Sequence, residues 1–384
     1  MPLIPLRPVL EAAMKHGYAQ GAFNVNAVAQ AKAVIEVHEM FRAPAILQGA
    51  DLANGFMGGR TDFLNATLED KIKGARNIAA AVTKFASGSP IPVVLHLDHG
   101  RDFDSVKAAV DGGYTSVMID GSALPFDENA ELTREVVKYA HARGVSVEGE
   151  LGILAGVEDH VEAGASTYTN PMKAVEFFRR TGVDCLAISY GTVHGVTKSE
   201  NVKLRTEIAQ AISECLLHEG IFGTLVSHGS SSVPRYIVDE INLLGGEVAN
   251  ARGIPVELLK KAISCGITKI NVDTDIRLAV TRNLRELFDK RPELRDSPTA
   301  GAVWKLLREK PEQFDPRAFF PPIMDTVMYG AVPDPSVEAV MACVEKGVCE
   351  VAGTLIVEFG SVGRAPLVEA RTLDEMAEYY KKRR

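Results

Sequence analysis

The sequence lacks the features that mark several large classes of protein. Its 384 residues contain no run of about 18 apolar residues, so no membrane-spanning helix is expected. The N-terminal stretch MPLIPLRPVLEAAMKHG has prolines where a signal peptide needs an apolar helix, so we expect no export signal. The net charge of −8 argues against a surface for nucleic acid or anionic membranes.

Cysteine is also scarce. The five cysteines show no C-x-x-C spacing and no regular framework, so we expect a reduced, cytoplasmic protein. With 46% hydrophobic and 24% charged residues, the composition is that of an ordinary globular protein. In so acidic a chain, an anionic substrate must be held by local devices, such as backbone N–H groups or a few arginines.

What the sequence does contain is an alternation of apolar β-type segments and amphipathic helical segments. Strands are predicted over residues 21–26, 44–49, 92–97, 115–120, 145–150, 184–191, 223–229 and 267–273. Helical patterns between them include residues 27–42, 103–112, 127–143, 171–182, 202–219 and 234–244.

Strands separated by helices indicate βαβ units and a parallel sheet. Eight such strands in about 250 residues fit an α/β (β/α)8 TIM barrel. An open doubly wound sheet is the alternative, but "FNVNAVAQ" after the first strand is not a glycine-rich dinucleotide turn. We expect one barrel domain over residues 1–384, with a core over 1–290 and a helical C-terminal extension over 291–384.

Polar residues recur where the predicted strands end. In a closed barrel these ends meet at one face, where enzymes of this fold build their sites. Three histidines fall there, His99, His194 and His228, and three imidazoles around an open position are typical of catalytic zinc. Taken singly, each histidine could instead be an ordinary polar residue that is hydrogen-bonded to its neighbours and binds no metal.

Carboxylates accompany these histidines. Asp98 adjoins His99, so one can bind a metal while the other handles a proton. Asp120 and Glu150 are candidates for a second metal position, although helix caps or ion pairs would also explain them. The glycine-rich stretch 150–166 resembles a mobile loop, on which Glu158 could move inward as a base or simply be solvated.

Two strand-to-helix turns suit a phosphate group. "HGSSSVP" (228–234) and "NVDTDIR" (271–277) both precede helical patterns, and N–H groups at a helix start attract anions. They follow the seventh and eighth strands, where barrels often bind phosphate. Either turn alone could be only a helix cap.

Several motifs together resemble class II, metal-dependent fructose-bisphosphate aldolases, from about residue 3 to the end. The "HGSSSVP" form and the long tail resemble the longer variant often found beside Calvin-cycle enzymes. The matching segments are "FNVN", "HLDHG", "GYTSVMIDGS", "VSVEGELG", "VEDH", "YGTVHGVTK", "HGSSSVP", "KINVDTDIR", "FDPRAFF" and "FGSVGRAPLVEARTLDEMAEYY".

The resemblance implies a role for each matching residue. His99, His194 and His228 would hold catalytic zinc, with Asp120 and Glu150 at a second divalent metal. The residues implied to bind a phosphosugar substrate, with Na⁺ or K⁺ often nearby, are Asn24, Gly195, Gly229, Ser230, Ser231, Asn271, Asp273 and Thr274. Arg317 would reach the second phosphate in a neighbouring subunit, which implies a homodimer or homotetramer.

The implied reaction is the reversible cleavage of fructose 1,6-bisphosphate through a metal-stabilised enediolate. Asp98 would take the proton of the C4 hydroxyl, and Glu158 would protonate the carbon of dihydroxyacetone phosphate. The pathways implied are glycolysis, gluconeogenesis and the Calvin cycle. One departure is Ala50, where the family commonly has a serine that contacts the aldehyde half; Asp51 or Asn54 is a candidate replacement.

Rival functions stay open at this point. Tagatose- or sedoheptulose-bisphosphate aldolases would use the same residues. A metal-dependent hydrolase could draw on His96 together with His99, but it has no use for two phosphate turns. A Schiff-base mechanism would need a lysine such as Lys269, and would leave the histidines idle. A non-catalytic phosphosugar sensor is the non-enzyme alternative.

Overall fold

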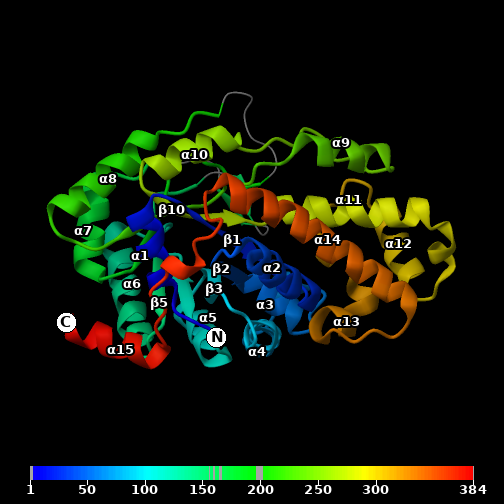
Figure 1. Ribbon diagram of the computed structural model, residues 1–384, viewed down its shortest axis with the longest axis horizontal. Coiled ribbons are helices and arrows are strands. Elements are labelled where there is room, and N and C mark those ends of the chain that lie inside the picture. The colour runs from blue at the N-terminus through cyan, green and yellow to red at the C-terminus, as the bar shows by residue number, and fades with distance from the viewer. Residues whose placement is uncertain (1–2, 155, 159–160, 164–166, 196–201, 384) are drawn as a thin grey trace.

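The computed structural model describes residues 3–154, 156–158, 161–163, 167–195 and 202–383, with backbone alone for 156–158 and 161–163 (Figure 1). Eight parallel strands close into a barrel in the order β1-β10-β9-β8-β5-β4-β3-β2. The predicted (β/α)8 barrel is therefore confirmed. Its strands are β1 (Gln20–Asn24), β2 (Ala45–Ala50), β3 (Val93–Gly100), β4 (Ser116–Ile119), β5 (Ser146–Leu151), β8 (Cys185–Ile188), β9 (Thr224–Ser227) and β10 (Ile267–Val272).

Helices surround the barrel and extend from it as an arm, at the right of Figure 1. No described helix combines the length and apolarity needed to cross a membrane. The helices are α1 (Leu6–His16), α2 (Val28–Phe41), α3 (Asp51–Met57), α4 (Leu68–Ala86), α5 (Phe103–Gly112), α6 (Phe126–His141), α7 (Pro171–Thr181), α8 (Thr206–His218), α9 (Arg235–Leu243), α10 (Val256–Ser264), α11 (Thr274–Lys290), α12 (Ala300–Glu309), α13 (Met324–Tyr329), α14 (Pro335–Glu358) and α15 (Leu373–Lys382).

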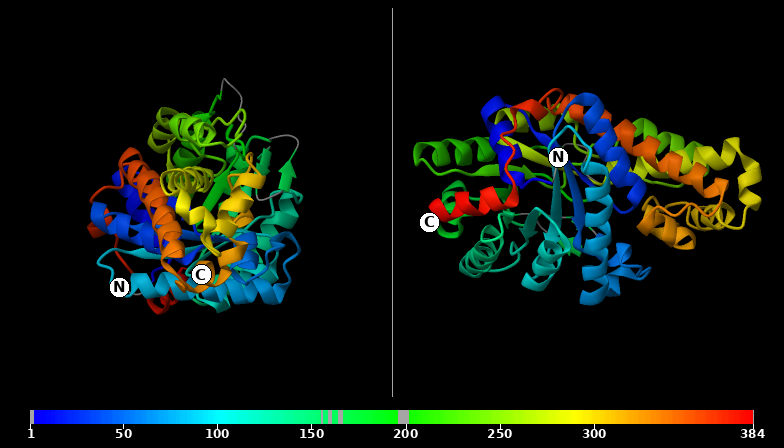
Figure 2. Two further views of the ribbon diagram at one scale, coloured as in Figure 1. Left: turned by 90° about the vertical axis from the view of Figure 1, so that its right-hand side faces the viewer. Right: turned by 60° about the horizontal axis from the view of Figure 1, so that its bottom comes forward.

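The C-terminal helices are joined closely to the barrel. Helix α14 packs along α2 and α11, and it also contacts β1 (Figures 1 and 2). Helix α15 lies against α6 on the other side of the molecule. Helix α14, which lies in the expected extension, therefore forms part of the wall around the barrel. The expected division into a core over 1–290 and an extension over 291–384 stays a prediction.

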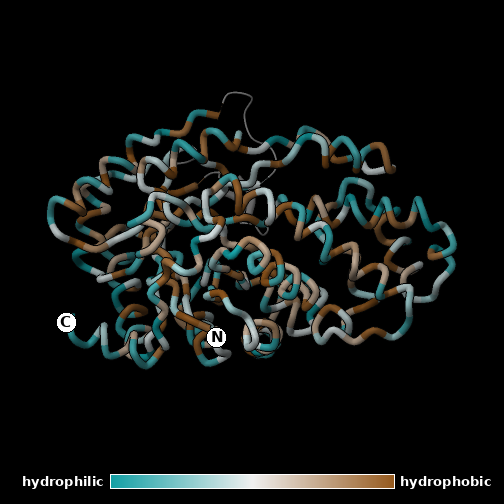
Figure 3. Tube along the Cα trace, viewed as in Figure 1, coloured by the Kyte–Doolittle hydropathy of each residue, from teal (hydrophilic) through white to brown (hydrophobic). Residues whose placement is uncertain are grey.

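Two apolar layers hold the barrel together. Outward side chains such as Leu97 join a large buried cluster with the surrounding helices. Inward side chains such as Val94 and Val226 pack against Leu6 and Leu10 of α1, which lies across the barrel interior. Figure 3 shows the resulting pattern, with hydrophobic residues along the strands and mixed colours along the covering helices. The strands are thus buried on both faces, as parallel strands require.

Local sequence signals explain where many helices begin and end. Helix α4 starts with a capping box between Thr67 and Asp70, and α7 starts with the Asn170 side chain followed by proline. Gly113 and Gly182 end α5 and α7 with φ of +110° and +69°, which a residue with a Cβ rarely adopts. Each glycine lies three residues before the first residue of the next strand, β4 or β8.

One element was not predicted. Within the stretch 150–166, interpreted from sequence as a loop, the strands β6 (Gly156–Glu158) and β7 (Val161–Ala163) pair antiparallel. Three-residue strands are too short for the period-2 alternation by which a strand is identified in a sequence. Glu158 thus lies on a small hairpin beyond β5.

Stability is expected to depend on pH through His38 on α2. Its ring is fully buried 5.3 Å from that of Phe23, its Nδ1–H donates to the Val34 carbonyl at 2.6 Å, and burial lowers its pKa to about 4. Since the unfolded chain binds this proton more tightly, the neutral ring's stability is present above about pH 6.5 and is lost towards pH 4. The unfolding free energy of the parent protein should therefore decrease between pH 7 and pH 5. We predict that this decrease is smaller by about 2 kcal/mol in His38→Leu.

Urea unfolding at both pH values would measure this effect. The exposed His218→Gln serves as the matched control and is expected to follow the parent protein. Equal pH dependence of the parent and His38→Leu would contradict the assignment.

Candidate active site

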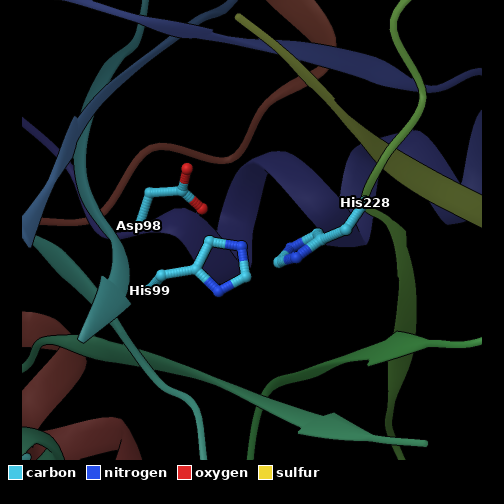
Figure 4. A group of neighbouring side chains, drawn as sticks. All are labelled: Asp98, His99 and His228. Atoms are coloured by element: carbon cyan, nitrogen blue, oxygen red, sulfur yellow. The ribbon is translucent and has the colours of Figure 1, made fainter. Parts of the chain in front are cut away.

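The three histidines predicted as ligands lie together at the end of the barrel where the strands finish. His99 is near the end of β3, His194 follows β8 and His228 directly follows β9. The ring centroid of His99 lies 4.8 Å from that of His228 and 5.7 Å from that of His194. Figure 4 shows the rings of His99 and His228 next to each other, with Asp98 alongside. The structure brings the imidazoles together, and their role as ligands stays a prediction.

A bulge in β3 turns His99 towards this group. Alternation along the strand places Leu97 against the helices and Asp98 inside the barrel, so regular continuation would point His99 outward. Instead, the pairing of β3 with β4 shifts between Leu97 and Gly100, and His99 has a φ of +48°. Such a conformation costs about 1–3 kcal/mol for a residue other than glycine, and strain of this kind is concentrated at functional sites.

The donor atoms at this mouth fit a divalent cation. Those of Asp98, His99 and His228 lie within 4.8 Å of one another, and so do those of His99, Asp120 and Glu150. Nδ1 of His228 and Oε2 of Glu150 are buried 3.3 Å apart, and neither has a hydrogen-bond partner among the described residues. A cation would satisfy both atoms, and the mixture of imidazole and carboxylate suits zinc and similar metals.

The protonation states agree with a site for a cation. Burial raises the pKa of Glu150, and the charge of Asp120 raises it further. Burial also acts to raise the pKa of Asp120, but its hydrogen bond with His99, at 3.2 Å, lowers it overall. For His228, burial alone would lower the pKa, but its hydrogen bond to Glu148 and the nearby Glu150 carboxylate, 3.3 Å from Nδ1, raise it to about 9. A bound metal would take the place of the proton that the carboxylates now favour.

Glu148 fixes the orientation of His228 and was missed by the sequence analysis. Its carboxylate accepts from Nε2 of His228 at 2.8 Å, so Nδ1 is the nitrogen left to face a cation. Nζ of Lys269 lies 3.0 Å from the same carboxylate, and Nε2 of His96 lies 3.4 Å away. Its position two residues before Glu150 on a strand was the available signal, because such residues share a face.

Asp98 is held between two amides. Asn271 donates to its Oδ1 at 2.9 Å, and Asn24 donates to its Oδ2 at 3.4 Å. The side-chain oxygens of the two asparagines have donors of their own. Lys269 donates to Oδ1 of Asn271 at 2.7 Å, and Gln48 donates to Oδ1 of Asn24 at 2.7 Å. Each amide therefore turns its NH₂ group to the carboxylate. The structure places both asparagines, predicted to bind substrate, against the predicted proton carrier.

The "HGSSSVP" turn is compact. Gly229 has a φ of +59°, and a Cβ there would come within 2.8 Å of the Val193 backbone. The Ser230 hydroxyl donates to the His228 carbonyl at 3.1 Å and lies 2.6 Å from the hydroxyl of Ser227. Ser230 and Ser231 follow His228 closely in the chain, and both are buried.

Two of the backbone N–H groups expected to attract an anion at this turn already donate to a side chain of the protein. Asp275 accepts from the Ser232 N–H at 2.8 Å and from the Val233 N–H at 2.7 Å. The sequence analysis placed the start of the next helix at Pro234, whereas α9 begins at Arg235. The N–H groups of Ser232 and Val233 are therefore already bonded to Asp275, and phosphate binding at this turn stays a prediction.

Five further residues were predicted from the sequence to belong to the site, and their positions are as follows. Asp273 and Thr274 begin α11, where Asp273 accepts from Nε of Arg277 at 2.9 Å. Gly195 follows His194 with a φ of +84°. The Glu158 side chain lies outside the described part of the molecule. Arg317 lies in a short 3₁₀ segment, Pro316–Ala318.

Arg317 is directed inward in this chain. Its side chain is 1% exposed, its Nη2 donates to Asp315 at 2.7 Å, and its guanidinium lies 4.4 Å from the centre of the Phe63 ring. The structure thus does not bring it to the histidines of the same chain. Contact with a neighbouring subunit's substrate would require this side chain to leave Asp315.

The position of the missing serine is occupied by a small, buried residue. Ala50 ends β2, and the next residue, Asp51, accepts from Lys71 at 2.6 Å. Asn54 accepts from the Tyr114 hydroxyl at 2.7 Å. The two residues considered as replacements for the serine are therefore hydrogen-bonded to other side chains of the same chain, Lys71 on α4 and Tyr114 just before β4.

Comparisons with known proteins agree with this geometry. The family model "Fructose-bisphosphate aldolase class-II" matches residues 4–333. A fructose-bisphosphate aldolase of Giardia intestinalis is 38% identical, over 99% of this chain and 100% of its own length. One from Treponema pallidum is 39% identical, over 84% of this chain and 92% of its own length.

A solved structure supports the same conclusion. The crystal structure of the YdjI aldolase from Escherichia coli K12 matches with a TM-score of 0.64 and 27% identity, over 94% of this chain and 99% of that chain. The family match includes all eight strands of the barrel, and the relative from Giardia intestinalis covers 99% of the chain. This chain is therefore an enzyme that belongs to the class II fructose-bisphosphate aldolase family.

Proposed function

We propose that the enzyme reversibly cleaves fructose 1,6-bisphosphate to dihydroxyacetone phosphate and glyceraldehyde 3-phosphate, with zinc as its catalytic metal. The observation that carries the proposal is the position of Asp98, fixed by two amides beside the three imidazoles. The substrate named for the relatives from Giardia intestinalis and Treponema pallidum supports it. His99, His194 and His228 would hold the zinc, and Asp120 and Glu150 would offer a second position.

The metal, when bound, would act as a Lewis acid that polarises the ketone of the substrate. Asp98 then has a single task, which is to accept the proton of the C4 hydroxyl as the C3–C4 bond breaks. Both of its oxygens already accept from amides, so the carboxylate is oriented before the substrate arrives. In the direction of synthesis Asp98 returns this proton to the new hydroxyl.

Glu158 would exchange the second proton, at the carbon of the three-carbon product. The hairpin that carries it follows β5 directly, and β5 also carries Glu150. A hairpin in this position can cover the substrate and exclude water during proton transfer. Gly195, Gly229, Ser230, Ser231, Asp273 and Thr274 would surround the phosphate, with Na⁺ or K⁺ beside it.

The structure favours this mechanism over a Schiff base. Lys269 is fully buried, and its ammonium donates to Asn271 while it pairs with Glu148. These partners bind the charged lysine, whereas a nucleophilic amine must be neutral. His96, considered for a hydrolase, contacts Ser116 at 2.8 Å and belongs to the same buried network.

The proposal extends to assembly and location. Arg317 would serve a neighbouring active site in a homodimer or homotetramer, after release from Asp315. A cytoplasmic enzyme of sugar-phosphate metabolism, in glycolysis, gluconeogenesis or the Calvin cycle, suits five cysteines that are all unpaired in the described structure.

Product analysis tests the reaction directly. Zinc-loaded enzyme is incubated with dihydroxyacetone phosphate and glyceraldehyde 3-phosphate, and the products are separated by chromatography and identified by NMR. We expect fructose 1,6-bisphosphate as the main product. Predominance of tagatose 1,6-bisphosphate would refute the proposed stereochemistry, and faster reaction with erythrose 4-phosphate would identify sedoheptulose bisphosphate as the better substrate.

The role of Asp98 predicts a separation between metal binding and turnover. Asp98→Ala is expected to lower kcat by at least about 100-fold, because the C4 proton loses its acceptor. Its zinc content, measured by atomic absorption, should match that of the parent. Loss of zinc along with activity would show that Asp98 is a ligand instead, and Asp111→Ala on the surface of α5 is the control.

Metal removal distinguishes the two kinds of aldolase. Dialysis against a chelator is expected to abolish cleavage, because the ketone of the substrate would no longer be polarised. Added zinc should restore cleavage. Borohydride added with substrate should leave the protein mass unchanged. A mass increase that maps to Lys269 would demonstrate the Schiff base and contradict the proposal.

A further inference from the structure

A cavity lies at the mouth of the barrel opposite the histidines, where the strands begin. Its volume is about 410 Å³, and its walls come from α1, α6, α7, α15 and the segments that precede β8 and β9. Val183 comes just before β8, and Phe222 just before β9. We call this space the basal cavity. Figure 1 shows α6, α7 and α15 grouped on this side of the barrel.

The basal cavity is basic in an acidic protein. Among its 13 lining residues four are arginine or lysine, one is histidine and none is aspartate or glutamate. The whole chain carries a net charge of −8, so cations are gathered here against the overall balance. The four cationic residues are Arg7, Arg134, Lys138 and Arg383.

Arg7 is the cation best fixed in place. Its side chain is 5% exposed, its Nη1 donates to Asp184 at 3.0 Å, and its Nε donates to Glu11 at 2.8 Å. The guanidinium lies 3.7 Å from the centre of the Phe222 ring. Its Nη2 is buried and has no hydrogen-bond partner among the described residues, so Arg7 lines the cavity with one donor group that Asp184 and Glu11 do not use.

The buried carboxylate nearby is already satisfied by other groups. Asp184 accepts from Arg7, from Nε2 of His141 at 2.8 Å, from the Tyr380 hydroxyl at 2.9 Å and from the Val147 N–H at 2.8 Å. The rings of His141 and Tyr380 stack with centroids 3.5 Å apart. This network ties α15 to the base of the barrel. Among the outer cations, Arg134 pairs with Glu131 at 2.6 Å, a carboxylate that is not among the lining residues of the cavity.

The rest of the wall is apolar. Phe178 and Phe222 contribute aromatic surface, and Ile221 and Val183 contribute aliphatic surface. A small cavity with apolar walls and a few fixed charged groups is the usual form of a ligand site. The charges select an anion, and the aromatic wall selects a ligand with an apolar or flat body.

We propose that the basal cavity binds a small organic phosphate, with its phosphate among Arg7, Arg134 and Lys138 and its organic part against Phe178 and Phe222. This site is separate from the proposed active site, which occupies the other end of the strands. Arginine and lysine are the residues that bind phosphate most strongly, and burial of Arg7 strengthens its contribution. The proposal does not depend on which sugar bisphosphate the enzyme cleaves.

Calorimetric titration of the metal-loaded enzyme with adenosine monophosphate at low salt tests the proposal. Adenosine monophosphate combines a phosphate with a flat ring system, while adenosine and inorganic phosphate each supply one half. We expect saturable binding of adenosine monophosphate, with weaker binding of inorganic phosphate and none of adenosine. Binding of adenosine as tight as that of its phosphate would overturn the role of the cations, and equal binding of inorganic phosphate would overturn that of the aromatic wall.

The location is tested with Arg134→Gln/Lys138→Gln, which removes two exposed cations from α6. These residues lie on the surface, so the variant should keep the parent's thermal midpoint, and its dissociation constant should rise at least tenfold. Lys107→Gln/Lys305→Gln is the matched control, since it removes two exposed, ion-paired lysines elsewhere and should bind like the parent. An unchanged dissociation constant for the α6 variant would refute the basal site. Cleavage is not the measured quantity, so this failure would leave the proposed reaction untouched.

Discussion

The structure of the site depends on one buried carboxylate. Glu148 has no exposed surface, and an unpaired charge in such a position would be very costly. Lys269, His228 and His96 surround it, and burial, which by itself raises the Glu148 pKa, is outweighed by the Lys269 charge and the histidine contacts. The ionised group then dictates the orientation of His228. The interactions that compensate for the burial of this carboxylate therefore also orient His228, a predicted metal ligand.

The same lysine links the predicted metal ligands to Asp98, the predicted proton carrier. Nζ of Lys269 contacts Glu148 and also donates to Asn271, which donates to Asp98. A chain of one ion pair and two hydrogen bonds therefore runs across the barrel from Glu148, the partner of His228, to Asp98 beside His99. Because each amide has one orientation in this chain, the position of Asp98 follows from packing inside the barrel and needs no contribution from substrate.

The sequence predicted most of this arrangement, because strand ends in a barrel converge whatever their exact limits. The convergence of the histidines needed only the alternation of elements. The bulge at His99 could not be predicted, since strict alternation would have placed that ring outside, and a register shift depends on pairing with β4. Asp275 also escaped notice, because its bonds to residues 232 and 233 join two segments about 40 positions apart, as seen only in the folded chain.

The two mouths of the barrel illustrate different uses of buried charge. At the end of the strands, Glu150 and His228 retain atoms without hydrogen bonds, which is the form expected of a site that awaits a ligand. At the beginning of the strands, Asp184 is fully bonded and holds α1, α6 and α15 together through Arg7, His141 and Tyr380. A purely structural network would be complete at that point. Nη2 of Arg7, a residue that lines the basal cavity, has no hydrogen-bond partner among the described residues, and the network around Asp184 does not use this donor.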